Sequence, residues 1–356
     1  MSTKRIILTG GGTAGHVTPN IALIPFLKEK GFEIAYIGSE LYIESTLIPD
    51  MNIPYVGIPT GMFRRYLTLK NITDPFKVLK GISKAKKFIK EYRPNIVFSK
   101  GGFVGLPVAF AAKMCHVPVI IHESDMTPGL ANRLSIPAAK KICCNFPETL
   151  KSLPKRKAVL TGSPIRSELL EGSRKKGLAL CSFSNDKPVI MVIGGSLGAA
   201  SINKAIREAL PDLLKDFYVV HLCGKDKLDE SLNNLQGYKQ FEYVTEGLND
   251  IYAMSDIVIS RAGANSICEI LALKKPNILV PLSKEASRGD QILNANSFAA
   301  QGYSIVIPDE ECTKETLTEK ITQLYFLRQT YIDTMMKSTQ SDAISTIINL
   351  ILKEMK

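Results

Sequence analysis

Short apolar runs recur along the first half of the chain and alternate with longer stretches in which apolar residues return at helical spacing. The runs are rich in Ile and Val and are continuously apolar, which predicts strands of a mostly parallel sheet buried on both faces. Helices are expected between them. The strands predicted for this half are 5–8, 33–37, 55–58, 95–99, 117–121, 140–143 and 158–160.

The same alternation returns in the second half, after a polar stretch at 171–176. A helix is predicted at 201–214, and a last apolar pattern from Ala343 to Ile351 predicts a helix with no strand after it. The strands predicted here are 189–193, 217–222, 241–244, 257–260, 277–280 and 304–307.

This pattern predicts an α/β protein of two doubly wound, Rossmann-like domains that face a cleft. The domains are expected at 1–163 and 164–340. The C-terminal helix, within 341–356, is expected to pack back on the first domain.

A glycine turn follows the first strand of each half. The stretch from Gly10 to Pro19 reads Gly-Gly-Gly-Thr-Ala-Gly-His-Val-Thr-Pro, and the stretch from Gly194 to Ala200 repeats the strand, glycine, helix order. Such turns leave backbone N–H groups accessible at a helix N-terminus, where an anionic or sugar ligand can approach. Both turns are therefore candidate ligand sites.

The first turn allows two interpretations. Gly10, Gly12 and Gly15 match the Gly-x-Gly-x-x-Gly pattern of dinucleotide-binding domains, but glycines at this spacing also serve only to close a tight turn. His16, at the mouth of the helix, can take a proton from an incoming hydroxyl. A histidine that merely caps the helix would look the same.

Two stretches of the second half place polar side chains at helix starts. From Ser260 to Glu269, small residues come first and a carboxylate follows, which suits a nucleotide whose ribose hydroxyls Glu269 accepts. Alternatively, Glu269 complements the helix dipole. Gln291 and Asn294 can bind a sugar or serve as solvated cap residues.

Composition narrows the class of protein. The 356 residues carry 45 Lys and Arg against 34 Asp and Glu, a net charge of +11, which predicts an anionic partner: nucleic acid, anionic lipid or a phosphorylated substrate. No apolar run reaches the ~20 residues of a membrane span. The seven cysteines are scattered and never spaced as Cys-x-x-Cys, so neither a disulfide framework nor a zinc site is expected.

Seven motifs occur together in the order and spacing of one known family, and they extend over essentially the whole chain. They are Gly11 to Pro19, Lys100 to Val104, His122 to Asp125 with Gly129 to Asn132, Gly162 to Arg166, Gly194 to Ala199, Ser260 to Glu269 and Asp290 to Ala295. On these residues the chain resembles the MurG family, the bacterial peptidoglycan glycosyltransferases of GT-B fold that convert lipid I to lipid II.

The resemblance implies the residues of the site. His16 matches the candidate base that activates the acceptor. The implied donor-binding residues are Thr13, Ala14, Gly15, Arg166, Ser196, Val244, Ala264, Asn265, Glu269 and Gln291. The implied acceptor or donor contacts are Glu123, Asp125, Asn132 and Phe103; Asp125 replaces an Asn, and Phe103 a Tyr, of some relatives.

The implied reaction is inverting transfer of N-acetylglucosamine from UDP-N-acetylglucosamine to lipid I. No Asp-x-Asp pair occurs in the chain, so we expect no metal and no cofactor, with helix N-termini and Arg166 stabilising the departing diphosphate.

The family also implies a location at the cytoplasmic face of the cell membrane, and wall-synthesis or division proteins as partners. A basic helix at 75–92 then predicts peripheral binding to the anionic leaflet, although an ordinary amphipathic helix would have the same pattern. The residues of this membrane patch are Phe76, Leu79, Lys77, Lys80, Lys84 and Lys87.

Three other functions compete with this one. Another GT-B enzyme that uses UDP-N-acetylglucosamine, such as a 2-epimerase or a different lipid glycosyltransferase, would share the second domain. An NAD-dependent oxidoreductase would leave the second glycine turn unexplained. A nucleic-acid-binding protein is disfavoured because no aromatic platform or recognition helix accompanies the charge.

Overall fold

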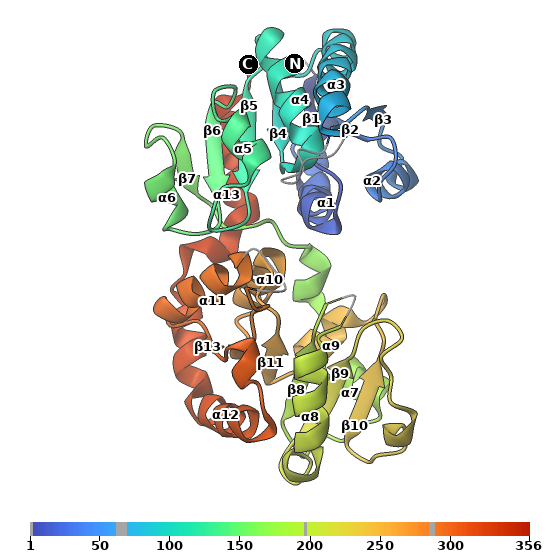
Figure 1. The fold of residues 1–356 in the computed structure, drawn as a ribbon, viewed down its shortest axis with the longest axis vertical. Helices are drawn as coiled ribbons and strands as arrows, with labels where there is room; N and C mark the ends of the chain where they lie inside the picture. The colour runs from blue at the N-terminus through green and yellow to red at the C-terminus, as the bar shows by residue number, and fades with distance from the viewer. Residues whose placement is uncertain (1–2, 62–69, 196–197, 285–288) are drawn as a thin grey trace. The chain divides into compact units, whose positions relative to one another are not determined.

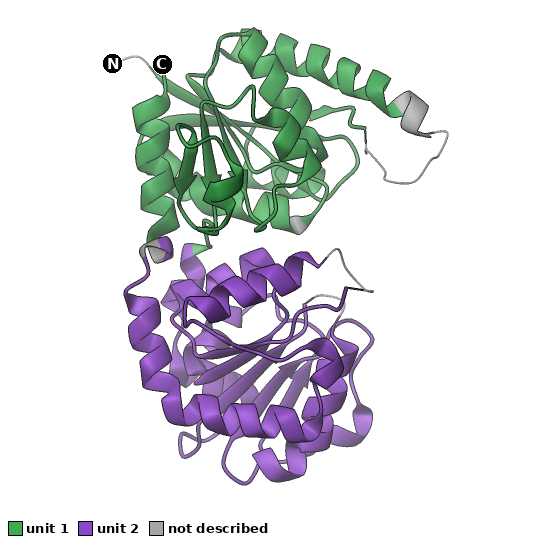
Figure 2. Cartoon of the chain, turned by 60° about the vertical axis from the view of Figure 1, so that its left-hand side comes forward, with its two compact units in different colours: residues 1–166, 342–356 green, residues 167–341 purple. Residues whose placement is uncertain are grey.

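The computed structural model describes residues 3–61, 70–195, 198–284 and 289–356 (Figure 1). The chain divides into two compact units (Figure 2). Unit 1 comprises residues 1–166 and 342–356, and unit 2 comprises residues 167–341. The division falls three residues after the boundary expected from the sequence.

Unit 1 contains a seven-stranded parallel sheet in the order β3-β2-β1-β4-β5-β6-β7. Each predicted strand of this half is confirmed, with ends shifted by no more than two residues. The strands are β1 (Lys4–Thr9), β2 (Phe32–Ser39), β3 (Tyr55–Ile58), β4 (Ile96–Ser99), β5 (Val119–Glu123), β6 (Lys141–Cys144) and β7 (Ala158–Leu160).

Helices cover both faces of this sheet because its strands are apolar on both sides. Along β1, Ile6 and Leu8 join one apolar cluster with α1 and α13, whereas Ile7 joins the opposite cluster with α3 and α4. The helices are α1 (Ala14–Glu29), α2 (Glu44–Leu47), α3 (Lys70–Tyr92), α4 (Gly102–Met114), α5 (Leu130–Ser135), α6 (Thr149–Ser152) and α13 (Ala343–Glu354), with the 3₁₀ turn η1 (Pro49–Met51).

The C-terminal helix α13 belongs to unit 1, although the segment that precedes it in the sequence belongs to unit 2 (Figure 2). Asp342 caps it by accepting a hydrogen bond from the Ser345 N–H. Ile347, Ile348 and Ile351 are buried in the cluster that includes α1 and β1. Burying each such side chain contributes about 1.5–3 kcal/mol, which holds the end of the chain on the sheet.

Unit 2 repeats the architecture with a six-stranded parallel sheet in the order β10-β9-β8-β11-β12-β13. Its strands are β8 (Val189–Ile193), β9 (Tyr218–Leu222), β10 (Tyr238–Phe241), β11 (Ile257–Ser260), β12 (Asn277–Leu279) and β13 (Ile305–Val306). Its helices are α7 (Arg174–Cys181), α8 (Ala200–Leu213), α9 (Leu248–Met254), α10 (Ala264–Ala272), α11 (Asp290–Ala300) and α12 (Lys314–Met336), with 3₁₀ turns η2 (Ser167–Glu171), η3 (Glu230–Leu232), η4 (Asp309–Glu311) and η5 (Thr339–Asp342).

One strand prediction is wrong in register. The strand expected at 241–244 lies at 238–241 instead, paired with β9 from Tyr238 opposite Val219 to Phe241 opposite Leu222. Because β10 is an edge strand among the described residues, its position is set by pairing with β9 rather than by its own apolar residues. Val244 therefore lies in the loop after the strand.

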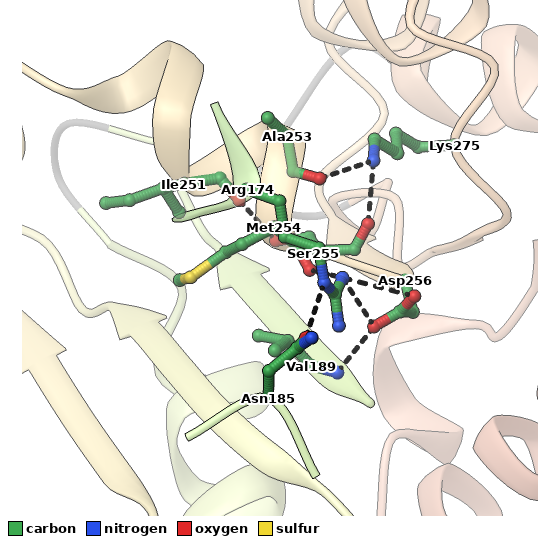
Figure 3. A network of polar contacts seen from close by, with 9 residues as sticks. All are labelled: Arg174, Asn185, Val189, Ile251, Ala253, Met254, Ser255, Asp256 and Lys275. Carbon is green, nitrogen blue, oxygen red and sulfur yellow. Dashed lines mark hydrogen bonds and ion pairs between the residues drawn. The ribbon is translucent and has the colours of Figure 1, made fainter. Parts of the chain in front are cut away.

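A polar network holds the amino ends of two central strands of unit 2 (Figure 3). The Asp256 carboxylate accepts from the Val189 N–H at 2.8 Å and from Arg174 Nη1 at 3.3 Å. Arg174 also donates to the Met254 carbonyl, and Lys275 Nζ donates to the Ser255 carbonyl at 2.7 Å. These contacts join α7, β8, β11 and the turn before β12, at the edge of the sheet opposite the glycine turn.

Each sheet changes winding direction at one place, between β1 and β4 in unit 1 and between β8 and β11 in unit 2. In doubly wound folds, ligands bind outside the carboxyl ends of the strands at such a switch point. In the part of the chain that the structure describes, no helix has the length and apolarity needed to cross a bilayer.

Candidate functional site

The switch point of unit 1 brings together the glycine turn after β1 and the segment after β4. The backbone N–H of Lys100 donates to the Thr9 carbonyl at 2.8 Å, which aligns the two segments. Gly102 lies so close that a Cβ there would stand 2.4 Å from the Gly11 carbonyl oxygen. Only glycine fits at this contact.

His16 lies in the first turn of α1 and faces the segment after β4. Its Nδ1 is 3.1 Å from the Lys100 carbonyl oxygen. A carbonyl oxygen only accepts, so Nδ1 carries the proton and Nε2 of the neutral ring keeps its lone pair. The ring is thus oriented as a proton acceptor, and the histidine does not act through its side chain as a helix cap.

The surroundings of His16 favour the neutral ring. Burial lowers the pKa of the imidazole most, and the Lys100 ammonium lowers it further. The hydrogen bond to the Lys100 carbonyl and the Glu44 carboxylate act in the opposite direction. Because the pKa lies below its usual range, His16 is unprotonated at neutral pH, as a general base must be.

Glu44 is a residue of this site that sequence reasoning missed. Its buried carboxylate accepts from the Gly12 N–H at 3.2 Å, from the Ser39 N–H at 3.2 Å and from the Ser39 hydroxyl. A Cβ on Gly11 would stand 2.0 Å from the Glu44 Oε1 atom. The glycines of this turn therefore admit a carboxylate of the same chain, and the Gly12 N–H is not available to an anionic ligand.

Three of the four predicted acceptor or donor contacts lie at the end of β5 or after it, and two of them, Glu123 and Asn132, form hydrogen bonds within this segment. The buried Glu123 carboxylate accepts from the N–H groups of Asp125 and Gly129, both at 3.0 Å, and from Asn132 Nδ2 at 2.8 Å. Burial raises the pKa of Glu123. Glu123 and Asn132 thus shape the loop that carries Asp125, which is half-buried.

The other predicted site residues of unit 1 are Phe103 and the residues at the start of α1. The Phe103 ring lies beside the glycine turn, with Cδ2 3.6 Å from where a Cβ on Gly12 would stand. Thr13 is exposed at the N-cap position of α1, with extended backbone and no side-chain cap hydrogen bond. Ala14 and Gly15 are the first two residues of the helix.

The switch point of unit 2 has the same plan. The glycine turn after β8 has positive φ at Gly195 and Gly198, and a Cβ on Gly198 would stand 2.1 Å from the Cys223 carbonyl oxygen. Ser196, a predicted donor-binding residue, lies outside the described residues. The segment after β11 leads into α10, where Ala264 is buried and Asn265 and Glu269 are half-buried.

Arg261, at the start of that segment, has a structural role that sequence reasoning missed. Its Nη1 donates to Asp309 at 2.6 Å and to the Val280 carbonyl at 3.0 Å, and its Nη2 donates to the Ser201 hydroxyl at 3.1 Å. The guanidinium joins the ends of β11 and β12 to the first turn of α8. It positions the loops that carry the predicted donor-binding residues.

Two amides of α11 hold that helix against the same loops. Gln291 Oε1 accepts from the Leu282 N–H at 3.1 Å, and Asn294 Nδ2 donates to the Ala262 carbonyl at 3.3 Å. Gln291 is half-buried and Asn294 is buried. Arg166, the last residue of the first segment of unit 1, and Val244 of unit 2 are also half-buried.

The N-caps of the helices that follow the switch-point strands differ from those of three other helices. Ser173, Thr313 and Asp342 cap α7, α12 and α13 with their side chains. Within the described residues, the N-caps of α1, α8 and α10, which follow the switch-point strands, make no such bond. Uncapped helix N-termini at these loops provide a positive electrostatic potential.

Comparison with known proteins agrees with this architecture. Residues 6–144 match the glycosyltransferase family 28 N-terminal domain, and residues 189–351 match the corresponding C-terminal domain. The UDP-N-acetylglucosamine–N-acetylmuramyl-(pentapeptide) pyrophosphoryl-undecaprenol N-acetylglucosamine transferase of Lachnospira eligens is 63% identical over 98% of both chains. That of Clostridium novyi is 56% identical over 100% of both chains.

Solved structures show the same fold. The structure of Acinetobacter baumannii MurG superimposes with a TM-score of 0.78 at 26% identity, covering 98% of this chain and 99% of the other. A UDP-N-acetylglucosamine 2-epimerase from Neisseria meningitidis has a TM-score of 0.68 at 15% identity, with 98% and 100% covered. The likeness to the epimerase is one of fold alone.

Two doubly wound units, each with a glycine turn at its switch point, define a glycosyltransferase of the GT-B class. The chain belongs to glycosyltransferase family 28, and within it to the MurG family of N-acetylglucosamine transferases.

Proposed function

We propose that the chain transfers N-acetylglucosamine from UDP-N-acetylglucosamine to lipid I, the N-acetylmuramyl-pentapeptide pyrophosphoryl-undecaprenol acceptor, and so forms lipid II for the peptidoglycan of the cell wall. The observation that carries the chemistry is the neutral His16 ring, whose Nδ1 is fixed by the Lys100 carbonyl. Relatives that match over nearly the whole chain support the choice of substrates over the epimerase alternative.

The reaction is a single inverting displacement. Nε2 of His16 takes the proton of the acceptor hydroxyl as the oxygen lone pair attacks the anomeric carbon of the donor sugar. The bond from that carbon to the diphosphate oxygen breaks, and its electron pair leaves with UDP. A hydroxyl attacking an α-linked sugar from the opposite face produces a β-linked product.

Unit 2 binds the donor in this proposal. Glu269 and Gln291 hold the ribose and sugar hydroxyls, and Ala264 and Asn265 border the nucleotide. Val244 contacts the base, and Ser196 and Arg166 contact the nucleotide side. Thr13, Ala14 and Gly15 of unit 1 approach the donor sugar and diphosphate. The uncapped N-termini of α8 and α10 stabilise the charge of the departing diphosphate, so transfer proceeds without a metal.

Unit 1 binds the acceptor and the membrane. Phe103 and Asp125 border the acceptor beside His16. On α3, Phe76 and Leu79 are 66% and 62% exposed, whereas Ala85 and Ile89 face the core. Lys80 and Lys87 are exposed, Lys77 pairs with Asp74, and Lys84 pairs with Glu40. An apolar, basic surface of this kind suits the anionic cytoplasmic leaflet, where wall-synthesis and division proteins would be its partners.

The decisive experiment measures transfer of radiolabelled N-acetylglucosamine to a lipid I analogue in the presence of EDTA. We expect native protein to form a β-linked lipid product, His16→Asn to lose about 10²–10⁴-fold in kcat, and Glu269→Ala to lose donor affinity. The matched control is His116→Asn, at an exposed histidine with positive φ that asparagine tolerates. Epimerised donor without lipid product would contradict the proposal.

A further inference from the structure

A lysine is completely buried behind His16. Lys100 follows β4, and its side chain has 0% exposed surface. Its Nζ lies 2.8 Å from His122 Nδ1, within hydrogen-bond distance of the Ser124 hydroxyl and 3.4 Å from the Ser163 hydroxyl. These groups come from the ends of β5 and from the segment after β7, so one ammonium joins three parts of unit 1.

The hydrogen-bond directions around this ammonium are fixed. His122 Nε2 is 2.8 Å from the Gly162 carbonyl oxygen, which only accepts, so Nε2 carries the proton. Nδ1 of His122 then accepts from the lysine. Burial and the lysine charge hold the pKa of His122 well below its usual range. The ring is a neutral acceptor that keeps the ammonium in place.

The same residue contacts the predicted base through its main chain, since the Lys100 carbonyl accepts the Nδ1 proton of His16. Two charged side chains act on the His16 ring. The Lys100 ammonium opposes its protonation and the Glu44 carboxylate favours it. The nearby His122 imidazole is neutral. Charges interact strongly here because little water screens them.

We propose that Lys100 is a positioning residue for the transfer reaction. Its carbonyl orients the His16 ring, and its buried ammonium, held by His122, Ser124 and Ser163, keeps that ring unprotonated until the acceptor hydroxyl arrives. The inference rests on the proposed role of His16 as the base. It assigns to Lys100 a function that requires its charge as well as its shape.

The test is an NMR titration of the histidine rings in the full chain, with the His16 signal assigned from His16→Asn. In Lys100→Met, which keeps the length of the side chain without the charge, we expect the pKa of His16 to rise by about 0.5–1 unit, the order of shift that one nearby charge produces. Lys100→Arg, which keeps the charge, should shift it less. Lys100→Gln, which can still donate to His122, is the second neutral variant should the methionine variant not fold.

Kinetics give an independent measurement. In the neutral variants the acidic limb of the kcat/KM profile should move upward with the His16 pKa, so that activity falls more at pH 6 than at pH 8.5. An unchanged His16 pKa in a folded neutral variant overturns the inference. A failure of the proposed function gives a different result. If His16 is not the base, His16→Asn keeps the kcat of the native enzyme, and this outcome does not depend on the titration.

Discussion

At the scale of single residues, the contact between the glycine turn and Glu44 decides the shape of the unit 1 site. Gly11→Ala would drive a methyl group to 2.0 Å from Oε1 of the buried Glu44 carboxylate, which already accepts three hydrogen bonds. We expect a loss of about 1–3 kcal/mol in unfolding free energy, measured by urea denaturation, together with lower transferase activity. Gly129→Ala is the control, since no atom lies within 4 Å of its Cβ position, and a comparable loss there would refute the explanation.

The charge of Glu44 has a separate effect, because it favours the protonated form of His16 that exists after proton transfer. Glu44→Gln should lower the pKa of His16 further and reduce kcat by about tenfold, a change of ~1.4 kcal/mol in the barrier. The pH dependence of kcat and an NMR titration would measure both. Glu29→Gln, at the exposed end of α1, should change neither; an unaltered His16 pKa in Glu44→Gln would exclude this electrostatic role.

These residues also show what the sequence cannot predict. His16 was recognisable because it follows a glycine turn in the same motif. Glu44 and Lys100 act on it from positions 28 and 84 residues away, and their contacts depend on how α2 packs beside β2 and how β4 pairs with β1. A local pattern carries no information on such long-range pairs, so the structure was needed to find them.

At the scale of elements, α3 separates its apolar residues into two sets. Phe76 and Leu79 are exposed, whereas Ile82 and Phe88 pack against the core. The double variant Phe76→Ser, Leu79→Ser should fold as well as native protein. It should bind anionic vesicles at least about tenfold more weakly, because serine buries much less apolar surface in the bilayer than Phe or Leu. Co-sedimentation measures this.

The control for α3 is Phe326→Ser on α12 of unit 2, where the phenylalanine is 84% exposed. It removes an exposed aromatic side chain of the same kind that does not belong to the proposed membrane patch on α3. Equal loss of vesicle binding in both variants would mean that general hydrophobicity, and not α3, is responsible. Neutral vesicles distinguish the contribution of the lysines, because only anionic lipid attracts them.

The strands themselves were largely predictable. Central strands such as β4 and β8 are buried on both faces, so each is an uninterrupted apolar run with clear ends. The exception, β10, reads Tyr-Lys-Gln-Phe, and only Tyr238 and Gln240 of its residues are buried. Lys239 is exposed and Phe241 is only partly buried, so the strand has no continuous apolar run, and its register follows from pairing with β9, which no local pattern contains.

Asp256 gives a prediction for the stability of unit 2 that is independent of the site. Asp256→Ala leaves the Val189 N–H without its carboxylate acceptor and Arg174 without its ion pair (Figure 3). We expect about 1–3 kcal/mol less unfolding free energy, with kcat unchanged at temperatures where the variant is folded. Asp216→Ala, at an exposed carboxylate, is the control; a variant as stable as native would show that the network contributes nothing.

At the scale of the whole molecule, both units use one plan. Each places its first strand beside its fourth, and each puts a glycine turn at that switch point. The sequence could predict this because alternating strands and helices with right-handed crossovers allow few arrangements. The sequence could not predict how the two turns are held. In unit 1 the Glu44 carboxylate binds the glycine turn, whereas in unit 2 the ion pair of Arg261 and Asp309 holds the loops.

Each unit also buries a histidine that is neutral when folded. His122 lies in unit 1 and His221 in unit 2, where burial lowers the pKa of His221 to about 3. His221 Nε2 donates to Asn203 and Nδ1 accepts from the Tyr238 hydroxyl. Protonation would place a charge in the core and would force the Tyr238 hydroxyl to accept instead of donate in the second bond, so the folded protein resists protonation at both sites.

Stability should therefore fall as the solution is acidified from pH 6.5 to 5, through and below the usual pKa of histidine. Across this range the unfolded chain binds protons at both histidines while the folded chain does not, so each contributes a loss of up to ~1.4 kcal/mol per pH unit. Urea denaturation at several pH values measures the slope. His221→Asn should be less stable at pH 7.5, but the unfolding free energy of unit 2 should depend less steeply on pH. His116→Asn, at an exposed histidine, is the control and should keep the native dependence on pH. An identical slope in His221→Asn and native protein would show that the buried imidazole does not govern acid unfolding.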